Sequence, residues 1–574
     1  MLSQPVETTG SGGQKSTRKM TFLSAMALKR QDRFLVLPLP SRGHLLATSL
    51  LVELETVTLP AYAPATSVVV GISGAKQNAA AALVVDGELR AFCEQERVTR
   101  VRRAGLADAS LPGEALDTVL GCAGGLARSA ILRYVTAETG IQLPDSLRRQ
   151  TLDHHQAHAA TAFFLSPFET ATVFVCDRHS AAQMSAWLGT ADGLREVKCL
   201  ASGQGFASLY SECSELLGLP PGNEHQLEAL ARLNGATTID GLEDLIGYRD
   251  GQIMVAPDWK ARAVQWLSDL GGDPMKMRAH FAAAFQRHLG NLLLSLLTDL
   301  RDRTGAAQLA LGGGLFYNTW FTTLARQSRI FDDVFVAPNP GNAGIAAGAA
   351  LSAADLRRCG PRRSVSPFLG PEYDAETIKR TLENCKLSYD VLNERELIDT
   401  TVTALMRGEL VAWFQGRMEW GHRALGGRSI VASPLSQYVL ENLNVYLKHR
   451  ERHRTYGVSI PVERTPEFFS GPPVSRFMEY EYRPLDPNQF GALLPEGARS
   501  LRVQTIPETP DSGSSHLFRA LHQRFGDATG VPILVNTSFN GFLEPMVCSP
   551  RDAVRVFFGS GLDRLVIGRF VIRK

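Results

Sequence analysis

The sequence predicts an α/β protein with more than one domain, and three observations support this prediction. The chain has 574 residues, which is too many for a single hydrophobic core. Short β-branched or apolar runs such as Val68–Ile72 and Ala171–Cys176 alternate with long helical patterns such as Met277–Leu300. The composition changes around residues 352–370, where Arg, Pro and Ser gather. We therefore expect two α/β parts joined by a linker over residues 356–370.

The first 65 residues are expected to form a disordered or loosely ordered extension. The first twenty are rich in Gly, Ser, Thr and Gln, and they lack the basic-then-apolar order of a secretion signal. The stretch from Phe34 to Ala63 is fairly apolar, but prolines and charged residues interrupt it. Ordered structure is predicted to begin near Ser67.

Three strand signals follow in a meaningful order. Ala80–Val85 and Glu88–Cys93 flank an Asp-Gly pair, which predicts a β-hairpin. The strand Ala171–Cys176 ends on Asp177, and the strand Gln308–Leu311 runs into three glycines. Tight turns at strand ends bring backbone N–H groups close to phosphates. Two such halves facing each other form a nucleotide cleft of the actin and sugar-kinase type.

Charge and cysteine content limit the classes of partner. Lys and Arg number 60 against 58 Asp and Glu, a formal charge of +2, so the whole molecule has no strong bias toward nucleic acid or anionic membrane. The eight cysteines are scattered without a CxxC pair, which favours free thiols in a reducing compartment. No apolar run approaches the roughly 18 to 20 residues of a membrane span. We expect a cytoplasmic protein that binds neither nucleic acid nor membrane.

A histidine cluster is the sharpest local feature. On a helix capped by Asp153, His154 and His158 lie four residues apart and share a face, whereas His155 points about 100° away. Two imidazoles and the carboxylate of Asp177 form an N/N/O ligand set for a divalent metal. Ordinary surface or capping histidines are the competing interpretation, and the pattern alone does not decide between them.

Basic residues gather in the last third of the chain. Arg423 lies in a glycine-rich loop, Gly416–Ser429, that directly follows an apolar strand. Lys448, Arg454 and Arg502 come later. Arginine offers a fixed fork of donors that matches phosphate or carboxylate oxygens, so the cluster predicts a small polyanionic ligand. A solvated basic loop and nucleic-acid binding are the alternatives.

Two further segments carry weaker signals. The mixed-sign run Glu94–Arg103 follows the first hairpin, and such a run is usually a solvated helix face. The strand that begins at Pro532 opens into Asn536, Thr537 and Ser538, which could hydrogen-bond a base, ribose or phosphate. Simple turn chemistry explains the second segment equally well.

From about residue 68 to the C-terminus, an ordered series of segments resembles the O-carbamoyltransferase family, which includes nodulation and antibiotic-tailoring enzymes. The segments are AAAALVVDGEL, ERVTRVRR, DHHQAHAATAFFLSPF, VFVCD, GGGLFYN, APNPGNAGIAAGAAL, GRMEWGHRALGGRS, KHRERHR, RVQ and NTSFNGFLEP. Each alone is a weak signal, whereas ten in this order are highly specific.

The resemblance implies an actin-like domain over residues 66–355, similar to the tRNA threonylcarbamoyl-transfer subunit, and a YrdC-like α/β domain over residues 371–574. In the family, the second domain converts carbamoyl phosphate to carbamate and adenylates it with ATP. The carbamoyl-adenylate then moves to the first domain, where a divalent metal, iron by resemblance, helps transfer to a hydroxyl. The partners implied are a hydroxylated small-molecule acceptor of secondary-metabolite or sugar type and a second copy of the chain in a homodimer.

The resemblance also assigns site residues. The catalytic residues are Arg423, Lys448, Arg454 and Gln77. The cofactor-binding residues are Arg102, Arg502, Asn536, Gly313 and Asn318. The metal ligands are His154, His158, Asp177 and Asn342.

Three positions depart from the family pattern, and they keep a second function open. Asn342 stands where the family has a metal-binding Asp, Gln77 where it has a histidine, and Arg102 where it has a lysine. An amide has no useful pKa, so Gln77 cannot act as a general base. The leading interpretation is an active carbamoyltransferase. The alternative is a degenerate paralogue that keeps nucleotide and carbamoyl phosphate binding as a regulatory or partner protein.

Overall fold

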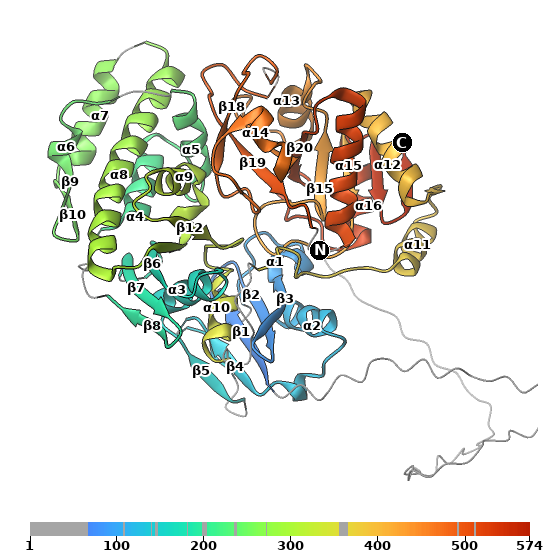
Figure 1. Ribbon diagram of the computed structural model, residues 1–574, viewed down its shortest axis with the longest axis horizontal. Helices are drawn as coiled ribbons and strands as arrows, with labels where there is room; N and C mark the ends of the chain where they lie inside the picture. Colours follow the sequence, from blue (N-terminus) through green and yellow to red (C-terminus); the bar gives the residue numbers. More distant parts are fainter. Residues whose placement is uncertain are drawn as a thin grey trace, which may run out of the picture. The chain divides into compact units, whose positions relative to one another are not determined.

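Two five-stranded sheets and one ten-stranded sheet organise the chain (Figure 1). The computed structural model describes residues 67–574, apart from residues 107–109, 139, 144–146, 181, 198–203, 235–237, 271, 355–364, 491–492 and 510–512. The extension predicted for residues 1–65 and most of the predicted linker lie outside the described residues. We call residues 67–354 the N-terminal half and residues 365–574 the C-terminal half. Both belong to one unit, Ala63–Lys574, and the domain boundaries given above stay predictions.

The first sheet contains the predicted hairpin. Its strands are β1 (Val68–Ser73), β2 (Ala80–Val85), β3 (Glu88–Glu94), β4 (Arg133–Thr136) and β5 (Arg149–Thr151), in the order β3-β2-β1-β4-β5. Between β2 and β3, Asp86 and Gly87 have φ values of 50° and 84°, as a two-residue type I′ turn requires. β4 runs parallel to β1, whereas β2 is antiparallel to β1.

The second sheet repeats this topology. Its strands are β6 (Ala171–Cys176), β7 (Met184–Thr190), β8 (Gly193–Glu196), β11 (Gln308–Gly312) and β12 (Asp333–Val336), in the order β12-β11-β6-β7-β8. β11 runs parallel to β6, and β7 is antiparallel to β6. Two sheets with one shared strand order are the duplicated core of an actin-like fold, so this prediction is confirmed.

Two helices fill the space between these sheets (Figure 1). α3 (His154–Phe164) packs on β6 and β11, whereas α10 (Ile345–Ser352) packs on β1 and β2, and the two helices contact each other. α10 reads IAAGAALS and buries seven of its eight residues. A helix that is apolar all round must be covered on every side, and this one is.

Helices form the remainder of the N-terminal half. They are α1 (Gln95–Thr99), α2 (Gly113–Cys122), α4 (Phe206–Leu216), α5 (Glu224–Arg232), α6 (Leu242–Leu245), α7 (Trp259–Leu270), α8 (Pro274–Thr304) and α9 (Thr319–Gln327), with a hairpin of β9 (Ile246–Arg249) and β10 (Gln252–Val255). α8, labelled in Figure 1, contains the helical pattern predicted at Met277–Leu300. Asp273 caps its first turn, and Gly305 ends it in the left-handed conformation.

The C-terminal half is built on the mixed ten-stranded sheet. Its order is β13-β22-β21-β14-β15-β20-β16-β19-β18-β17. The strands are β13 (Asp390–Val391), β14 (Val411–Phe414), β15 (Arg428–Ala432), β16 (Gly457–Pro461), β17 (Phe469–Ser470), β18 (Glu481–Pro484), β19 (Leu501–Ile506), β20 (Leu534–Ser538), β21 (Arg564–Ile567) and β22 (Phe570–Arg573). The helices are α11 (Ala375–Asn384), α12 (Glu394–Met406), α13 (Val439–Glu441), α14 (Thr465–Phe468), α15 (Gly513–Thr529) and α16 (Pro550–Phe558). The α/β fold class is confirmed, and the YrdC-like assignment of the C-terminal half stays a prediction.

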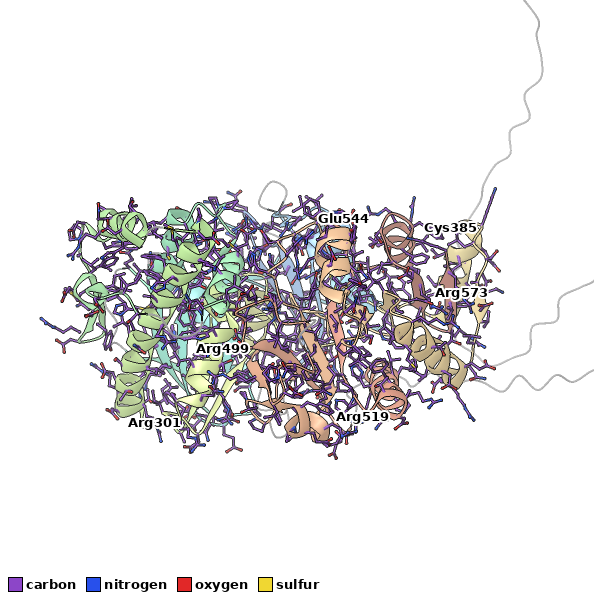
Figure 2. The ribbon with its side chains drawn as sticks, turned by 90° about the horizontal axis from the view of Figure 1, so that it is seen from above. Arg301, Cys385, Arg499, Arg519, Glu544 and Arg573 are labelled. Carbon is purple, nitrogen blue, oxygen red and sulfur yellow. The ribbon has the colours of Figure 1, made fainter. Side chains whose placement is uncertain are left out.

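Three observations complete the description. Seen from above, Arg301 on α8 and Arg573 on β22 lie on opposite sides (Figure 2). Among the described residues, no helix is both long and apolar enough to cross a membrane. Six described cysteines are free thiols, and Cys385, next to α11, is the exposed one among them.

Candidate functional site

Two strand ends of the second sheet form the floor of the candidate site. β6 and β11 are parallel neighbours, so Asp177 and Gly313 follow them at the same edge of the sheet. The N–H of Gly314 donates to Asp177 Oδ2 at 3.1 Å, and that of His179 donates to Oδ1 at 2.8 Å. Gly313 has a φ of 102°, which an L side chain rarely adopts, and its N–H donates to the carbonyl of Pro340. The predicted meeting of the Asp and glycine strand ends is present in the structure.

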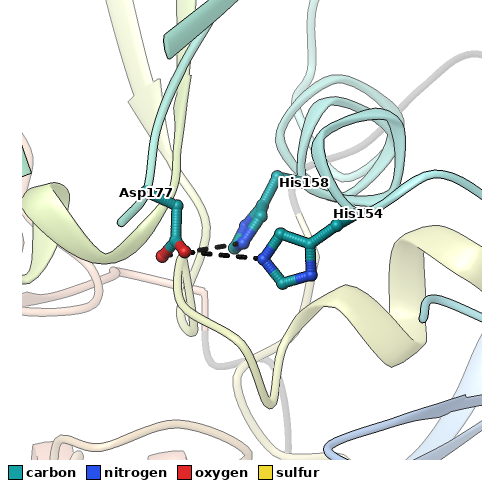
Figure 3. A group of neighbouring side chains, drawn as sticks. All are labelled: His154, His158 and Asp177. Carbon is teal, nitrogen blue, oxygen red and sulfur yellow. Dashed lines mark ion pairs between the residues drawn. The ribbon is translucent and has the colours of Figure 1, made fainter. Parts of the chain in front are cut away.

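The histidine helix faces this edge. The carboxylate of Asp153 accepts hydrogen bonds from the N–H groups of His155 and Gln156, so it caps α3 as predicted. His154 and His158 point toward Asp177 (Figure 3), and the ligand atoms of the three residues lie within 4.8 Å of one another. His154 Nε2 is 3.5 Å from Asp177 Oδ1, and His158 Nε2 is 3.9 Å from Oδ2. His155 is turned away, and its Nδ1 lies 2.8 Å from the hydroxyl of Ser185.

His158 is held in the state that a metal ligand needs. Its Nδ1 lies 3.1 Å from the carbonyl of Pro340, which can only accept, so Nδ1 carries the proton and Nε2 presents a lone pair. Burial lowers the pKa of His158 to about 3, so the ring is neutral. The amide oxygen of Asn342 lies 3.3 Å from this Nε2. The Nε2 lone pair of His158 and the Asn342 oxygen are both acceptors, so one divalent cation in contact with both atoms would satisfy them.

The rest of the N/N/O set also fits a divalent cation. Burial alone would raise the pKa of Asp177, but the two histidines and the N–H of His179 hold that pKa well below its ordinary value, so the group is a carboxylate. His154 Nε2 is buried and makes no hydrogen bond, although it lies 3.5 Å from Asp177 Oδ1. A buried ring nitrogen that faces a carboxylate without a hydrogen bond fits a pair of ligands to one cation.

A cavity of about 790 Å³ connects this group to the C-terminal half. Its walls come from both halves of the chain. Eight predicted site residues line it: Gln77, Arg102, Asp177, Asn318, Asn342, Arg423, Arg454 and Arg502. Gln77 and Arg102 therefore face the same space as the metal group and the arginines of the C-terminal half.

The arginines make one wall of the cavity electropositive. Burial lowers the pKa of Arg423 and of Arg454 to about 10, and burial with the nearby Arg423 lowers that of Arg502 well below its ordinary value. Arg423 donates from Nη2 to the carbonyl of Tyr317 at 3.3 Å, while its Nε is buried without a partner. Crowded, partly unpaired guanidinium groups favour an anion that supplies several acceptors.

Four predicted residues lie behind the cavity wall or use their polar groups in the fold. Lys448 Nζ donates to the Ser538 carbonyl, the Asn540 carbonyl and Asn540 Oδ1, which uses all three protons of its ammonium group. Asn536 Nδ2 donates to Gln504 Oε1, while its Oδ1 is buried without a partner. Asn318 lines the cavity but caps α9 through Oδ1 and donates from Nδ2 to Gln286. Gly313 acts through its backbone.

A buried ion network behind the arginines was not predicted from the sequence. Arg232 on α5 pairs with Glu228, one turn away, and with Glu481 of β18, and the side chains of all three are at most 6% exposed. Glu228 also accepts from the N–H and hydroxyl of Thr319. In the sequence, Glu228 and Arg232 form an ordinary i,i+4 pair, which indicates a solvated helix face. Only the fold brings Glu481 to them.

The interpretation of Glu94–Arg103 as a solvated helix face was wrong for its first part. The side chains of Glu94 and Arg97 are 9% and 10% exposed, and they form an ion pair at 2.7 Å. Arg97 Nη2 donates to the Gly421 carbonyl, and Arg100 donates to the carbonyls of Pro545 and Met546. The segment is covered because it lies against the C-terminal half, a contact that charge alternation cannot reveal. Arg102 and Arg103 are exposed as predicted.

Comparison with known proteins places this geometry in a family. Residues 128–351 match the family model described as the carbamoyltransferase N-terminus, and residues 402–574 match that of the carbamoyltransferase C-terminus. The nodulation protein NolO of Bradyrhizobium diazoefficiens is 30% identical over 74% of this chain and 79% of its own length. The chain belongs to the carbamoyltransferase family and is an enzyme of that class.

Two further similarities are more partial. The 3'-hydroxymethylcephem-O-carbamoyltransferase of Amycolatopsis lactamdurans is 31% identical over 45% of this chain and 48% of its own length. The solved structure of full-length HypF in its phosphate- and nucleotide-bound form is 14% identical, with a TM-score of 0.38, over 51% of this chain and 48% of that one.

Proposed function

We propose that the enzyme transfers a carbamoyl group from carbamoyl phosphate to a hydroxyl, through a carbamoyl-adenylate made with ATP. Carbamoyl phosphate and water give carbamate and phosphate. Carbamate and ATP give carbamoyl-adenylate and pyrophosphate. The adenylate and an alcohol then give the carbamate ester and AMP. The observation that supports this sequence best is the single cavity shared by the arginines of the C-terminal half and the Asp177–Asn342 edge of the N-terminal half.

The arginine wall would bind the phosphate groups. Arg423, Arg454 and Arg502 offer forked donors to an anion in a site where burial already disfavours their unpaired charge. An activated intermediate formed there would stay within one cavity until the acceptor arrives. Arg102, at the edge of the same cavity, can neutralise the departing phosphate of AMP.

His154, His158, Asp177 and Asn342 would hold a divalent metal, with iron as the metal that the resemblance implies. When bound, such an ion polarises a carbonyl or lowers the pKa of an alcohol. Gln77 cannot remove a proton, but its amide can donate to the carbamoyl oxygen and accept from the carbamoyl NH₂ group, which would orient that group for attack.

The acceptor is proposed to be a hydroxylated small molecule, and the setting the cytoplasm. The scattered free cysteines among the described residues are compatible with a reducing compartment. Neither nucleic acid nor membrane is part of the proposal, and a homodimer is the assembly that we propose.

The test is pyrophosphate release from ATP and carbamoyl phosphate, followed by a search for carbamate ester by mass spectrometry. The acceptor panel contains 3'-hydroxymethylcephem, chitooligosaccharides and simple sugars. Arg423→Ala should abolish release. Arg452→Ala is the matched control, because that side chain is 77% exposed and forms an ion pair with the surface residue Glu441.

Two results would contradict the proposal in different ways. A wild-type enzyme that releases no pyrophosphate from ATP and carbamoyl phosphate would refute the adenylate route. Normal pyrophosphate release with no ester from any acceptor would favour the degenerate paralogue, which Gln77 and Asn342 make the natural second candidate.

A further inference from the structure

Two loops from opposite halves of the chain touch beside the cavity. One is residues 338–342 of the N-terminal half, and the other is residues 421–423 of the C-terminal half. A Cβ added to Gly421 would lie 2.5 Å from the Pro338 carbonyl oxygen, so the backbones are in direct contact. The first loop also supplies the Pro340 carbonyl that orients His158, and the second ends on Arg423.

Arg97 lies beside these loops and contacts the second one directly. Its Nε donates to Glu94 Oε2 at 2.7 Å, and its Nη2 donates to the Gly421 carbonyl at 3.1 Å. The planar guanidinium group makes both bonds at once, with the carboxylate fixing its plane. The backbone two residues before Arg423 is therefore held by a side chain of the other half.

The Glu94 carboxylate also connects to the guanidinium group of Arg423, through Asn339 and Tyr317. Glu94 Oε1 accepts from Asn339 Nδ2 at 2.8 Å, and Asn339 Oδ1 accepts from the Tyr317 hydroxyl at 2.6 Å. The Tyr317 carbonyl in turn accepts from Arg423 Nη2. The Tyr317 ring also packs edge-on against His422, with 4.3 Å between the ring centroids. The contacts form a closed circuit that fixes both the backbone and the head group of Arg423.

We propose that Arg97 is a positioning residue: it sets the orientation of Arg423 for the anion, so the activation site of the C-terminal half is completed by the N-terminal half. This inference rests on the proposed function of Arg423. Bidentate recognition of a small anion depends on fixed donor positions, and a displacement of about 1 Å can cost about a hundredfold. Arg97 lines the cavity as well, but its Nε and Nη2 are bound to Glu94 and Gly421, so its role in this proposal is to act through Arg423.

The experiment compares Arg97→Lys with Arg100→Lys in the full-length protein. Lysine keeps the charge beside Glu94 but loses the fork that spans Glu94 and Gly421. Arg100 is the matched control, because it also donates to carbonyls of the C-terminal half, but to those of Pro545 and Met546 and not to that of Gly421. Arg97→Lys should raise the KM for carbamoyl phosphate in pyrophosphate release by about tenfold or more. Arg100→Lys should leave that KM within about twofold.

A second pair of variants covers a loss of folding in Arg97→Lys. Gly421→Ala pushes the two loops apart and should raise the same KM. Gly561→Ala is its control, because an added Cβ there meets nothing closer than the Tyr446 carbonyl oxygen at 4.0 Å. Melting temperatures show whether each variant is folded at the assay temperature, since positioning predicts a raised KM in the folded protein.

Calorimetric titration with inorganic phosphate gives a readout that does not need turnover. Arg97→Lys and Gly421→Ala should weaken phosphate binding by a factor similar to the change in KM, and both controls should bind as the wild type does. If the wild type releases no pyrophosphate, the proposed function fails while phosphate binding still decides the role of Arg97. Equal phosphate affinity in Arg97→Lys, Gly421→Ala and the wild type would overturn the inference.

Discussion

Restoring a carboxylate at residue 342 should strengthen metal binding. Asn342 Oδ1 lies 3.3 Å from His158 Nε2, and Asp177 Oδ2 lies 3.9 Å from the same nitrogen. The two oxygens are therefore at most 7.2 Å apart, the sum of these distances. Asn342→Asp would place two negative charges around one neutral imidazole.

The expected gain follows from this separation. Two unit charges about 7 Å apart repel by about 2 kcal/mol at an effective dielectric constant of about 20. A divalent cation that contacts both carboxylates attracts each of them more strongly than they repel each other, because it carries two charges and lies closer to each of them. A net gain of about 2 kcal/mol corresponds to about thirty-fold in affinity, and we expect at least this gain.

The assay is a Co²⁺ titration against a competing chelator. Asn78→Asp is the matched control, because this substitution adds the same charge to the same cavity. Asn78 does not belong to the group formed by His154, His158 and Asp177. His158→Ala gives the affinity without the site. The reasoning is refuted if Asn342→Asp binds no more tightly than Asn78→Asp, or if His158→Ala retains as much metal as the wild type.

Three further predictions concern activation, metal dependence and stability. Removing the ion held by His154, His158 and Asp177, with Mg²⁺ then restored for ATP, should lower ester formation by about a hundredfold or more while pyrophosphate release stays within about twofold, and equal losses would contradict separate roles for the two halves. Arg232→Met should destabilise the fold by about 3–5 kcal/mol in urea denaturation, because Glu228 and Glu481 would stay buried without their cation, and a loss below about 1 kcal/mol would contradict this. Burial raises the pKa of Glu479 to about 7, so its neutral form favours folding: that contribution is full below the unfolded value of 4.5 and is lost as the pH rises through about 7. Glu479→Gln should therefore gain up to about 3 kcal/mol of stability relative to the wild type between pH 4.5 and pH 8, and parallel pH profiles would contradict the assignment.

The sequence predicted those parts of the fold that depend on residues close together in the chain. The Asp86-Gly87 turn needs two residues that accept positive φ, and the chain supplies them. Asp153 caps α3 and thereby fixes the helical register that turns His154 and His158 to one face. The N/N part of the metal group follows from four residues of spacing, whereas Asp177 followed from its place at a strand end. The resemblance was needed for Asn342 and Gln77, because no local pattern connects them.

The other features of the site could not be predicted from the sequence, because they depend on contacts between distant segments. Arg97 and Arg232 have their first carboxylate three or four residues away, so in sequence both belong to common surface pairs. Their burial depends on Gly421 and Glu481, which lie hundreds of residues later. Lys448 was assigned to the ligand because cations usually face anions, yet its three protons meet oxygen acceptors of the 538–540 segment. The sequence showed the chemical type of each residue, but it did not show which distant residue each one would contact.

The placement of charge also explains why the two halves work as one enzyme. Arg423 and Arg502 lie in the C-terminal half, but the nearest buried carboxylates that offset them include Glu228, which comes from α5 of the N-terminal half. Without Glu228 these guanidinium groups would repel one another in a buried site, and with too many carboxylates they would no longer attract phosphate. Arg232 neutralises part of the charge of Glu228. The arginine wall therefore stays positive, but the repulsion between its buried guanidinium groups is limited. Glu228→Gln should therefore tighten inorganic phosphate binding in calorimetry while lowering the melting temperature, because the variant trades fold stability for a stronger anion site. A variant that loses both phosphate affinity and stability would show that Glu228 orders the arginines and does not set their charge balance.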